Sequence, residues 1–372
     1  MRIAILGARG IPACYSGYDT LVEELACGLA RANGADVLVY CRRNYYKNRP
    51  AHYGGVRLFY LPAPRLKAFE SLFHSFISSL HVLGQRADIV YFVDPANAPF
   101  CLLLRLCGKK VVVHTDGLGW KRAKWGPLAR RYYKFVEWLC ARVANALVTD
   151  NPEMQAYYRR EYDAASAYIP YGAQSSYGED DAVYREFGLL PGGYLLVVAR
   201  LEPENNTDLI IREYTASSVE LPLVVTGDSP YDSSYTGLLK SLANEKVIFT
   251  GRINDQPKLN SLYKGAVLYI HGHEVGGTNP SLLRAMSAGT APFVLNVPFN
   301  TNVVGNCGFI FEKSKGNLKK KLRRLATDYK ACEEMGQKAG MRADKFFSWD
   351  SVVDDHFRLF LQLRENEQKL RD

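Results

Sequence analysis

The stretch RIAILGARGIPACYSGYDTLVEELACGLARA, residues 2–32, decides the fold of this chain. Its first residues, 2–7, form a short apolar run that ends at a glycine, which is typical of a buried strand followed by a loop. Thr20 and Glu23 then have the spacing of a capping box, so we expect a helix to start near residues 18–19. A strand, a glycine-rich loop and a helix in this order predict the opening unit of a doubly wound α/β sheet.

The same alternation continues along the rest of the chain. Further predicted strands, all rich in Val and Ile, lie at 37–41, 56–61, 88–93, 110–115, 146–150, 194–200, 221–228, 247–251, 266–272 and 291–296. Their apolar residues are continuous rather than alternating, which favours parallel strands that helices cover on both faces. Helical patterns separate these runs, so the fold class is α/β with parallel sheets.

Two domains and a final helix account for this order of elements. After 166–173 the chain becomes polar and acidic before the strands begin again, which places a linker near 170–185. We therefore predict an N-terminal domain over 1–175 and a C-terminal domain over 176–348, with a cleft between them. Residues 349–372 begin as an amphipathic helix and end in a basic, polar tail.

The charge of the chain is unevenly distributed. Of its 372 residues, 47% are hydrophobic and 23% are charged, which excludes a disordered or fibrous protein. The formal net charge is +9, but residues 1–175 carry 23 Lys and Arg against 13 Asp and Glu, a net of +10. Residues 176–372 carry 24 against 25. We therefore expect an anionic partner to meet the first half of the chain.

Targeting and redox features are few. The apolar run at the N-terminus is too short for a secretory signal, and no stretch reaches the roughly 20 apolar residues of a membrane-spanning helix. The eight cysteines are scattered, without a CxxC or paired histidine spacing, which argues against disulfide frameworks and zinc sites. We expect a reduced, cytoplasmic protein.

The loop over 7–20 is a candidate anion site. Gly10 and Gly17 permit close approach of the backbone, and the loop leads into the N-terminus of a helix, where free N–H groups favour an anion. The pattern is not the GxGxxG of dinucleotide-binding folds. The alternative is that these glycines only form turns.

A second loop, over 111–126, follows another predicted strand. His114 and Asp116 are candidate functional side chains at its start, although a histidine here can equally be a core residue and Asp116 can equally serve a turn. Basic and aromatic residues follow, namely Trp120, Lys121, Arg122, Lys124 and Trp125. They are suited to phosphate or to anionic lipid headgroups, and the alternative is a solvated surface.

Two loops of the second half also favour an anion. Arg200 lies at the carboxyl end of a predicted strand, where it can neutralise a phosphate. The segment 271–289 runs from a strand into a helix through a glycine-rich turn, with Pro280 at the first helical position. One anion-binding helix start in each domain indicates a diphosphate-containing ligand that bridges the cleft.

Taken together, these loops resemble the retaining GT-B glycosyltransferases of family 4, and in particular the bacterial rhamnosyltransferase-type enzymes that build cell-surface polysaccharides. The motifs that carry the resemblance are GARGIPACYSGYDT (7–20), DGLGWKRAKWG (116–126), RLEPENN (200–206) and GGTNPSLLRAM (276–286). The likeness extends over nearly the whole chain, from residue 1 to about residue 363. It implies two Rossmann-like domains facing a cleft, with the C-terminal helix crossing back to the N-terminal domain.

The resemblance also implies roles for individual residues. A nucleotide-sugar donor would lie against the C-terminal domain, and Asp116, Arg200 and His114 would be catalytic. The implied donor-binding residues are Gly10, Gly17, Tyr18, Asn205, Gly251, Arg252, Ile253, Gly277, Thr278, Asn279, Pro280, Ser281 and Arg284. The basic and aromatic segment from Trp120 to Trp125 would face the acceptor or a membrane. The family implies that neither a metal nor another cofactor is needed, and the adjacent acidic pairs at 180–181 and 354–355 are not a DxD motif.

The chain departs from the family pattern at three positions. Many members have a Lys where this chain has Asn205, so one phosphate-binding charge is missing. The paired glutamates of the family fall at Gly276 and Arg284. Arginine cannot accept hydrogen bonds from ribose hydroxyls. Either Arg284 supplies the missing phosphate charge, which is the hypothesis we adopt, or ribose recognition differs.

The expected function is transfer of a sugar, rhamnose from a dTDP donor by resemblance, to a saccharide or lipid-diphosphate-linked acceptor. Retention without an enzymic nucleophile fits front-face displacement, in which the protein positions the reactants and stabilises developing charge. We expect a peripheral location at the inner face of the cytoplasmic membrane and no nucleic-acid partner. The alternatives are a sugar-nucleotide epimerase of the same architecture and a non-catalytic nucleotide- or carbohydrate-binding protein.

Overall fold

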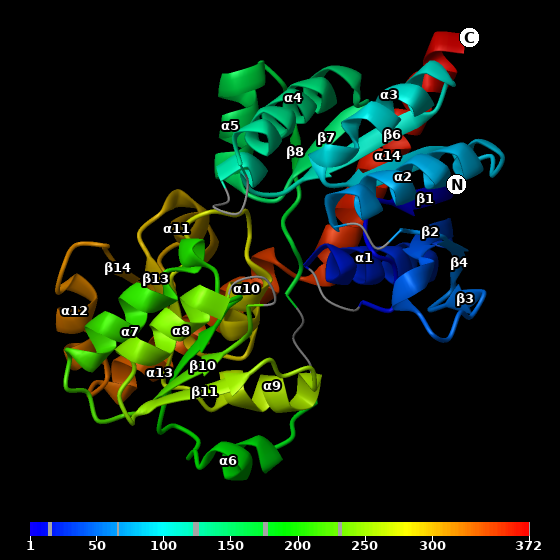
Figure 1. Ribbon diagram of the computed structural model, residues 1–372. Coiled ribbons are helices and arrows are strands. Elements are labelled where there is room, and N and C mark those ends of the chain that lie inside the picture. Colours follow the sequence, from blue (N-terminus) through cyan, green and yellow to red (C-terminus); the bar gives the residue numbers. More distant parts are fainter. Residues whose placement is uncertain (14–16, 65–66, 122–125, 174–177, 230–232, 372) are drawn as a thin grey trace. The chain divides into compact units, whose positions relative to one another are not determined.

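The chain divides into two units, and each is described by itself. Unit 1 comprises Met1–Gly172 with Trp349–Asp372, and unit 2 comprises Ala173–Ser348. The computed structural model (Figure 1) describes residues 1–13, 17–64, 67–121, 126–173, 178–229 and 233–371. The predicted domain boundary at residue 175 therefore lies outside the described residues.

Unit 1 is built on an eight-stranded sheet in the order β3-β4-β2-β1-β5-β6-β7-β8. Its strands are β1 Arg2–Leu6, β2 Asp36–Arg42, β3 His52–Tyr53, β4 Val56–Leu61, β5 Ile89–Val93, β6 Lys110–Thr115, β7 Ala146–Thr149 and β8 Ala167–Tyr168. Neighbouring strands run parallel except for β3, which pairs antiparallel with β4. Every residue of the central strand β5 is buried, which explains why its sequence is apolar without alternation.

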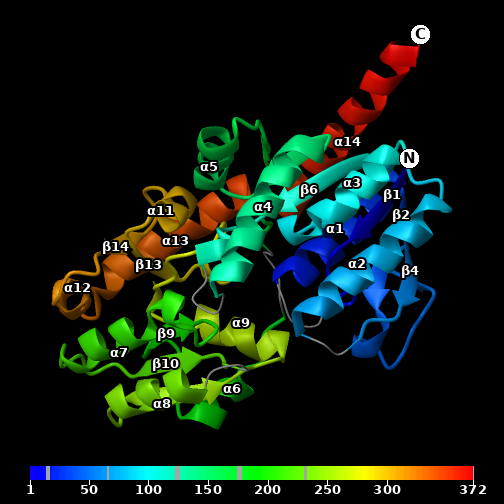
Figure 2. The same ribbon diagram turned by 45° about the horizontal axis from the view of Figure 1, so that its top comes forward.

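Helices cover both faces of this sheet. They are α1 Gly17–Asn33, α2 Lys67–Leu83, α3 Ala98–Leu106, α4 Pro127–Val143, α5 Pro152–Tyr162 and α14 Trp349–Arg371, with the 3₁₀ turns η1 Arg43–Tyr45, η2 Pro95–Asn97 and η3 Gly119–Lys121. The chain steps in one direction from β1 to β2 and in the other from β4 through β7, so right-handed crossovers place α1 on one face and α2, α3 and α4 on the other. Figure 2 shows α2 and α3 side by side, in agreement with their contacts.

The C-terminal helix α14 packs on α1 within unit 1. A Cβ atom at Gly28 of α1 would lie 2.4 Å from Val353 Cγ2 of α14, so glycine is what permits this approach. The predicted return of the last helix to the first domain is confirmed. Including α14, unit 1 carries 27 Lys and Arg against 19 Asp and Glu, and it remains the more basic unit.

Unit 2 contains a six-stranded parallel sheet in the order β11-β10-β9-β12-β13-β14. Its strands are β9 Leu195–Val198, β10 Leu223–Thr226, β11 Val247–Gly251, β12 Leu268–His271, β13 Ala291–Leu295 and β14 Phe309–Phe311. Its helices are α6 Ala182–Phe187, α7 Thr207–Thr215, α8 Ser233–Leu242, α9 Gln256–Lys264, α10 Pro280–Ser287, α11 Pro298–Val304, α12 Asn317–Leu325 and α13 Tyr329–Phe346, with the 3₁₀ turn η4 Pro203–Asn205. The predicted fold class, with two Rossmann-like α/β sheets, is confirmed.

The sequence pattern missed the shortest strands. β3 and β8 have two residues each and β14 has three, which is too short for a periodic signal. Several predicted strands in unit 2 also extend beyond the observed ones. The run at 194–200 ends as β9 at Val198, because the following residues turn into the loop that carries Arg200.

Candidate functional site

The loop after β1 is shaped by packing at Gly10. Its φ is +122°, and a Cβ atom there would lie 2.5 Å from Cys41 Sγ, so no other residue fits. Helix α1 begins at Gly17, close to the predicted start, and the buried Asp19 accepts a hydrogen bond from Arg9 N at 3.0 Å. The turn-forming explanation therefore accounts for Gly10 without a ligand.

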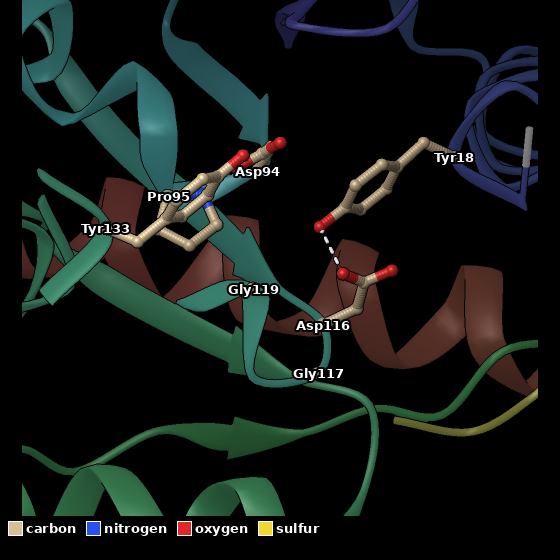
Figure 3. A pocket seen from close by; sticks show the side chains of 7 residues that line it. All are labelled: Tyr18, Asp94, Pro95, Asp116, Gly117, Gly119 and Tyr133. Carbon is tan, nitrogen blue, oxygen red and sulfur yellow. Dashed lines mark hydrogen bonds between the residues drawn. The ribbon is translucent and has the colours of Figure 1, made fainter. Parts of the chain in front are cut away.

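A small open pocket in unit 1 gathers residues from four segments (Figure 3). Its lining residues are Tyr18, Asp94, Pro95, Asp116, Gly117, Gly119 and Tyr133. Tyr18 donates its hydroxyl to Asp116 Oδ1 at 2.6 Å, and Tyr171 donates to Asp116 Oδ2 at 3.4 Å. Burial, followed by the charge of Asp116, raises the pKa of Tyr18 well above its usual range, so this tyrosine remains a donor. The structure thus brings together Tyr18, a predicted donor-binding residue, and Asp116, a predicted catalytic residue.

His114 is fully buried, and the centre of its ring is 6.2 Å from that of the pocket residue Tyr18. Its Nδ1 is 2.8 Å from the Tyr91 hydroxyl, which is also 2.9 Å from Nε2 of His356 on α14. The Nε2 atom of His114 has no hydrogen-bond partner among the described residues, and burial lowers the pKa of His114 well below its usual value. The imidazole is therefore neutral, and it does not line the pocket. This placement favours a structural role for His114 in the core of unit 1 over the predicted catalytic role.

Trp120 is held by its own unit. Its Nε1 donates to Tyr157 Oη at 3.1 Å, and the Lys134 ammonium lies 4.2 Å from the centre of its ring. The same Tyr157 hydroxyl donates to the buried Glu137 at 2.8 Å. The indole thus fixes the loop after β6 to α4 and α5, which does not support the predicted membrane role for it. Lys121 is exposed, and Arg122, Lys124 and Trp125 lie outside the described residues.

In unit 2 the loops after β9 and β12 meet at one edge of the sheet. Asn206 donates its side-chain amide to Gly272 O at 2.8 Å, and Glu274 N donates to Glu204 O at 3.1 Å. The Arg200 side chain is 44% exposed at this edge and forms an ion pair with Glu202 at 3.3 Å. A partly exposed guanidinium at the carboxyl end of a parallel strand can bind a phosphate.

Asn205 serves this loop rather than a ligand. Its side chain is buried and donates to Arg200 O at 2.7 Å. The amide thereby holds the backbone that carries Arg200, a role that lysine could not fill in the same way. We assign Asn205 to loop positioning, in place of direct donor contact.

The start of α10 is closed by its own cap. Asn279 Oδ1 accepts from Ser281 N at 3.0 Å and from Ser281 Oγ at 2.7 Å, and this hydroxyl is also 2.7 Å from Tyr269 Oη. The resemblance implies that Ser281 binds the donor, but in this structure its amide already donates to Asn279. Thr278 is buried, Pro280 is the first helical residue, and Gly277 is half-buried.

The guanidinium of Arg284 is held between α9 and α10. The residue is 9% exposed, and its guanidinium donates to Gln256 Oε1 at 2.6 Å and Gln256 O at 2.7 Å. It also lies 5.5 Å from the centre of the Tyr263 ring. These contacts hold α9 to α10, so the hypothesis that Arg284 replaces the missing phosphate charge is not supported.

The remaining predicted donor residues lie after β11. Gly251 ends that strand with a φ of +67° and accepts a hydrogen bond from Gly227 N at 2.9 Å. Arg252 is exposed and Ile253 is half-buried. The structure thus places them on an open turn, where they stay candidates for contact with a base.

Two histidines at the unit 2 edge were missed by the sequence reasoning. The rings of His271 and His273 are stacked 4.2 Å apart with an angle of 7° between their planes. Burial lowers the pKa of His271 to about 3, and burial together with His271 and Arg200 lowers the pKa of His273 well below its usual range. A pair of neutral rings thus lies beside the Arg200 loop. The only sign of this pair in the sequence was the position of the two histidines on either side of Gly272.

The described residues offer neither a metal-binding cluster nor a membrane-spanning helix. Among the described residues, no group of three or more His, Cys, Asp or Glu side chains could hold a metal ion. None of the helices in the described ranges combines the length and the hydropathy needed to cross a bilayer.

Known proteins resemble the chain in both halves. Residues 1–174 match a family described as a domain of unknown function (DUF1972), and residues 190–342 match the family described as glycosyl transferases group 1. No curated protein matches the chain in sequence.

Three solved structures illustrate the likeness in fold. Sucrose-phosphate synthase from Thermosynechococcus elongatus is 20% identical, with a TM-score of 0.81 and coverage of 97% of this chain and 98% of that one. HepE from Anabaena, in complex with UDP, is 13% identical, with a TM-score of 0.76 and coverage of 97% and 100%. WaaG, a glycosyltransferase involved in lipopolysaccharide biosynthesis, is 17% identical, with a TM-score of 0.70 and coverage of 95% and 99%. The chain therefore has the GT-B fold.

Proposed function

We propose that this chain, a glycosyltransferase whose group 1 domain spans residues 190–342, transfers a sugar from a nucleoside-diphosphate donor to a saccharide or lipid-linked saccharide, with retention of configuration. The observation that carries the proposal is the partly exposed Arg200 on the edge where the loops after β9 and β12 meet. A diphosphate there would gain charge-assisted hydrogen bonds in a site that the loop contacts already hold in place.

The donor is a nucleotide sugar, and comparison supports that class. HepE has been solved with UDP and with UDP-glucose. In this chain the exposed turn at Gly251 and Arg252 is suited to the base, because it follows an edge strand of the same sheet. The guanidinium of Arg200 would hold the diphosphate, with the neutral His273 ring beside it.

The proposed chemistry is a front-face displacement. The bond between the anomeric carbon and the diphosphate oxygen breaks, and the acceptor oxygen forms a bond to the same face of that carbon. The acceptor proton passes to the departing diphosphate, so no enzymic nucleophile is required. The protein contributes positioning of the reactants and stabilisation of the developing negative charge, which Arg200 supplies.

The pocket in unit 1 would hold the transferred sugar or the acceptor hydroxyl. Asp116 presents a carboxylate there, and the 2.6 Å hydrogen bond from Tyr18 fixes its orientation. A carboxylate in a fixed position can accept hydrogen bonds from sugar hydroxyls. Rhamnose as the sugar, a lipid-diphosphate-linked acceptor and a peripheral location at the membrane are the finer parts of this proposal. They are supported by the motif resemblance and by the basic character of unit 1.

A thermal-shift screen tests donor binding. UDP, GDP, dTDP and their sugars are added to the purified chain, and the matching nucleotide at 100 times its Kd should stabilise the fold by about 2.7 kcal/mol. Arg200→Ala should remove most of that shift. Arg212→Ala is the matched control, because Arg212 is an exposed unit 2 arginine in a surface pair with Asp208.

The outcomes separate the alternatives. If no nucleotide stabilises the chain, or if both arginine variants behave alike, the donor site is wrong. Conversion of a nucleotide sugar into its epimer without an acceptor and without release of the diphosphate would favour the epimerase.

A further inference from the structure

Helix α2 has its polar and apolar faces reversed relative to a surface helix in water. Four apolar side chains at spacings of four, three and four residues form an outward stripe, with Phe69 57% exposed, Phe76 42% exposed, Leu80 48% exposed and Phe73 half-buried. The inward face is mostly polar. Its buried residues are Glu70, His74, Ser75, Ser78 and Ser79, together with the apolar Val82. A helix on a soluble domain normally places the apolar stripe inward.

The inward polar groups are poorly satisfied. The hydroxyls of Ser75 and Ser78 have no hydrogen-bond partner among the described residues. Burial is the largest influence on His74, and it lowers the pKa of this histidine to about 3, so its ring is neutral. Buried polar atoms without hydrogen-bond partners cost free energy. Aromatic side chains exposed to water as a continuous patch are unusual on a protein that contacts water alone. The outward face is therefore built for an apolar contact.

The apolar surface continues onto the two neighbouring helices. The rings of Phe76 on α2 and Phe100 on α3 are 6.1 Å apart. Leu106 at the end of α3 is 79% exposed. On α4, the exposed rings of Phe135 and Trp138 stack at 5.9 Å. Because α3 contacts both α2 and α4, we treat these side chains as one surface, which we term the outer helical face.

The charges on the outer helical face have one sign. Arg131 and Arg142 are exposed and lie in a single stripe with Phe135 and Trp138, again at spacings of four, three and four residues. The other exposed arginines of these helices are Arg105 and Arg130. The only carboxylates on α2, α3 and α4 are those of Glu70 and Glu137, and both residues are buried. The face therefore combines apolar side chains with uncompensated positive charge.

This combination selects among possible occupants. In a symmetric contact with a second copy, the same patch would meet itself, so exposed arginines would face arginines. An anionic bilayer offers both an apolar layer for Phe, Leu and Trp and negative headgroups for Arg. The match in chemistry is therefore to a lipid surface.

We propose that the outer helical face of α2, α3 and α4 binds the surface of an anionic lipid bilayer. Its aromatic and leucine side chains enter the boundary between headgroups and acyl chains, and its arginines contact the headgroups. The membrane contact would then lie on α2, α3 and α4 and not on the segment 120–125. It does not depend on which sugar is transferred, because it concerns binding in the absence of substrates.

Vesicle co-sedimentation of the full chain tests the proposal without any donor. Vesicles of phosphatidylcholine with one quarter phosphatidylglycerol should bind the chain, and pure phosphatidylcholine should bind it far more weakly. Arg131→Gln with Arg142→Gln should weaken binding roughly 25-fold, or about fivefold per arginine. Phe69→Ser with Phe76→Ser and Leu80→Ser should weaken it by about tenfold or more.

The matched control lies on α12, the most basic helix of unit 2. Lys320 and Arg324 are exposed there, but the leucines of that helix are buried. Lys320→Gln with Arg324→Gln should leave vesicle binding within about twofold, because removing charge away from the outer helical face changes no lipid contact.

Several results would overturn the proposal. They are failure of the unaltered chain to bind anionic vesicles, an equal loss in the α12 control, or a lipid-independent dimer in sedimentation analysis that the serine variant abolishes. If the serine variant does not fold, Leu106→Ser with Trp138→Ser replaces it, and undiminished binding by that variant counts against the proposal.

Discussion

Removing the Tyr18 hydroxyl tests whether Asp116 acts in the pocket of unit 1. Tyr18→Phe keeps the aromatic ring, whose centre lies 6.2 Å from that of His114, and deletes the 2.6 Å hydrogen bond to Asp116 Oδ1. The other described contact of this carboxylate, from Tyr171, is long at 3.4 Å and cannot replace the lost bond.

The magnitude follows from the type of bond. A hydrogen bond to a charged group contributes about 1.5–3 kcal/mol. If the orientation of Asp116 is needed only in the transition state, the loss reduces kcat/KM by roughly 10- to 150-fold. The assay is the rate of nucleoside diphosphate release with donor and acceptor present, at a temperature below unfolding.

A matched control separates function from stability. Tyr235 in unit 2 is buried and donates its hydroxyl to Asp208 at 2.9 Å, but it lies outside the pocket. Tyr235→Phe should lower the free energy of unfolding without changing kcat/KM. In an Asp116→Asn background, Tyr18→Phe should cost much less than in the unaltered chain. Equal kcat/KM for the two phenylalanine variants, or additive effects of the two pocket substitutions, would refute the reasoning.

Two further predictions concern the fold around the site. Gly28→Ala should destabilise unit 1 by about 1–3 kcal/mol in urea unfolding, because its Cβ atom would meet Val353 at 2.4 Å. In a Val353→Ala background the same substitution should be neutral or stabilising. An equal loss of stability in both backgrounds would contradict the packing of α14 on α1. Burial lowers the pKa values of three histidines to about 3 for His74 and His271 and about 4 for His356, so their contribution to stability is complete above the unfolded pKa of about 6.5 and is lost as the pH falls toward those values. At pH 5, each of these neutral histidines should lower the free energy of unfolding by about 2 kcal/mol relative to pH 7. The His356→Gln variant should therefore lose less stability than the unaltered chain between pH 7 and pH 5. An equal loss would show that His356 is not buried in its neutral form.

The fold was largely predictable because its signals are local. Continuous apolar runs marked ten of the strands beyond β1. The capping-box spacing placed the start of α1 to within two residues, although Thr20 lies inside the helix and Glu23 accepts hydrogen bonds from Ala13 N and Tyr53 Oη instead. Strands of two or three residues gave no such signal. The return of α14 to unit 1 followed from the family resemblance, since the contact between Gly28 and Val353 joins positions far apart in the chain.

The candidate site was predictable by segment but not by side chain. Asp116 and Arg200 were singled out because each follows a predicted strand, and each does follow one, β6 and β9; their functional roles stay predictions. The uses of Asn205 and Arg284 could not be read from the sequence, because each depends on a partner that only folding brings near. Likewise, the reversed faces of α2 are invisible to periodicity, which shows that a stripe exists but not which side is buried.

Analysis of the reaction products tests the central claim most directly. The chain is incubated with the nucleotide sugar that stabilises it most and a panel of saccharide and lipid-linked acceptors, and the products are followed by proton NMR. We expect one nucleoside diphosphate for each new glycoside, an anomeric configuration identical to that of the donor, and a rate at least about 100-fold lower for Arg200→Ala. A glycoside of inverted configuration, or a rate that does not change in Arg200→Ala, would contradict the account.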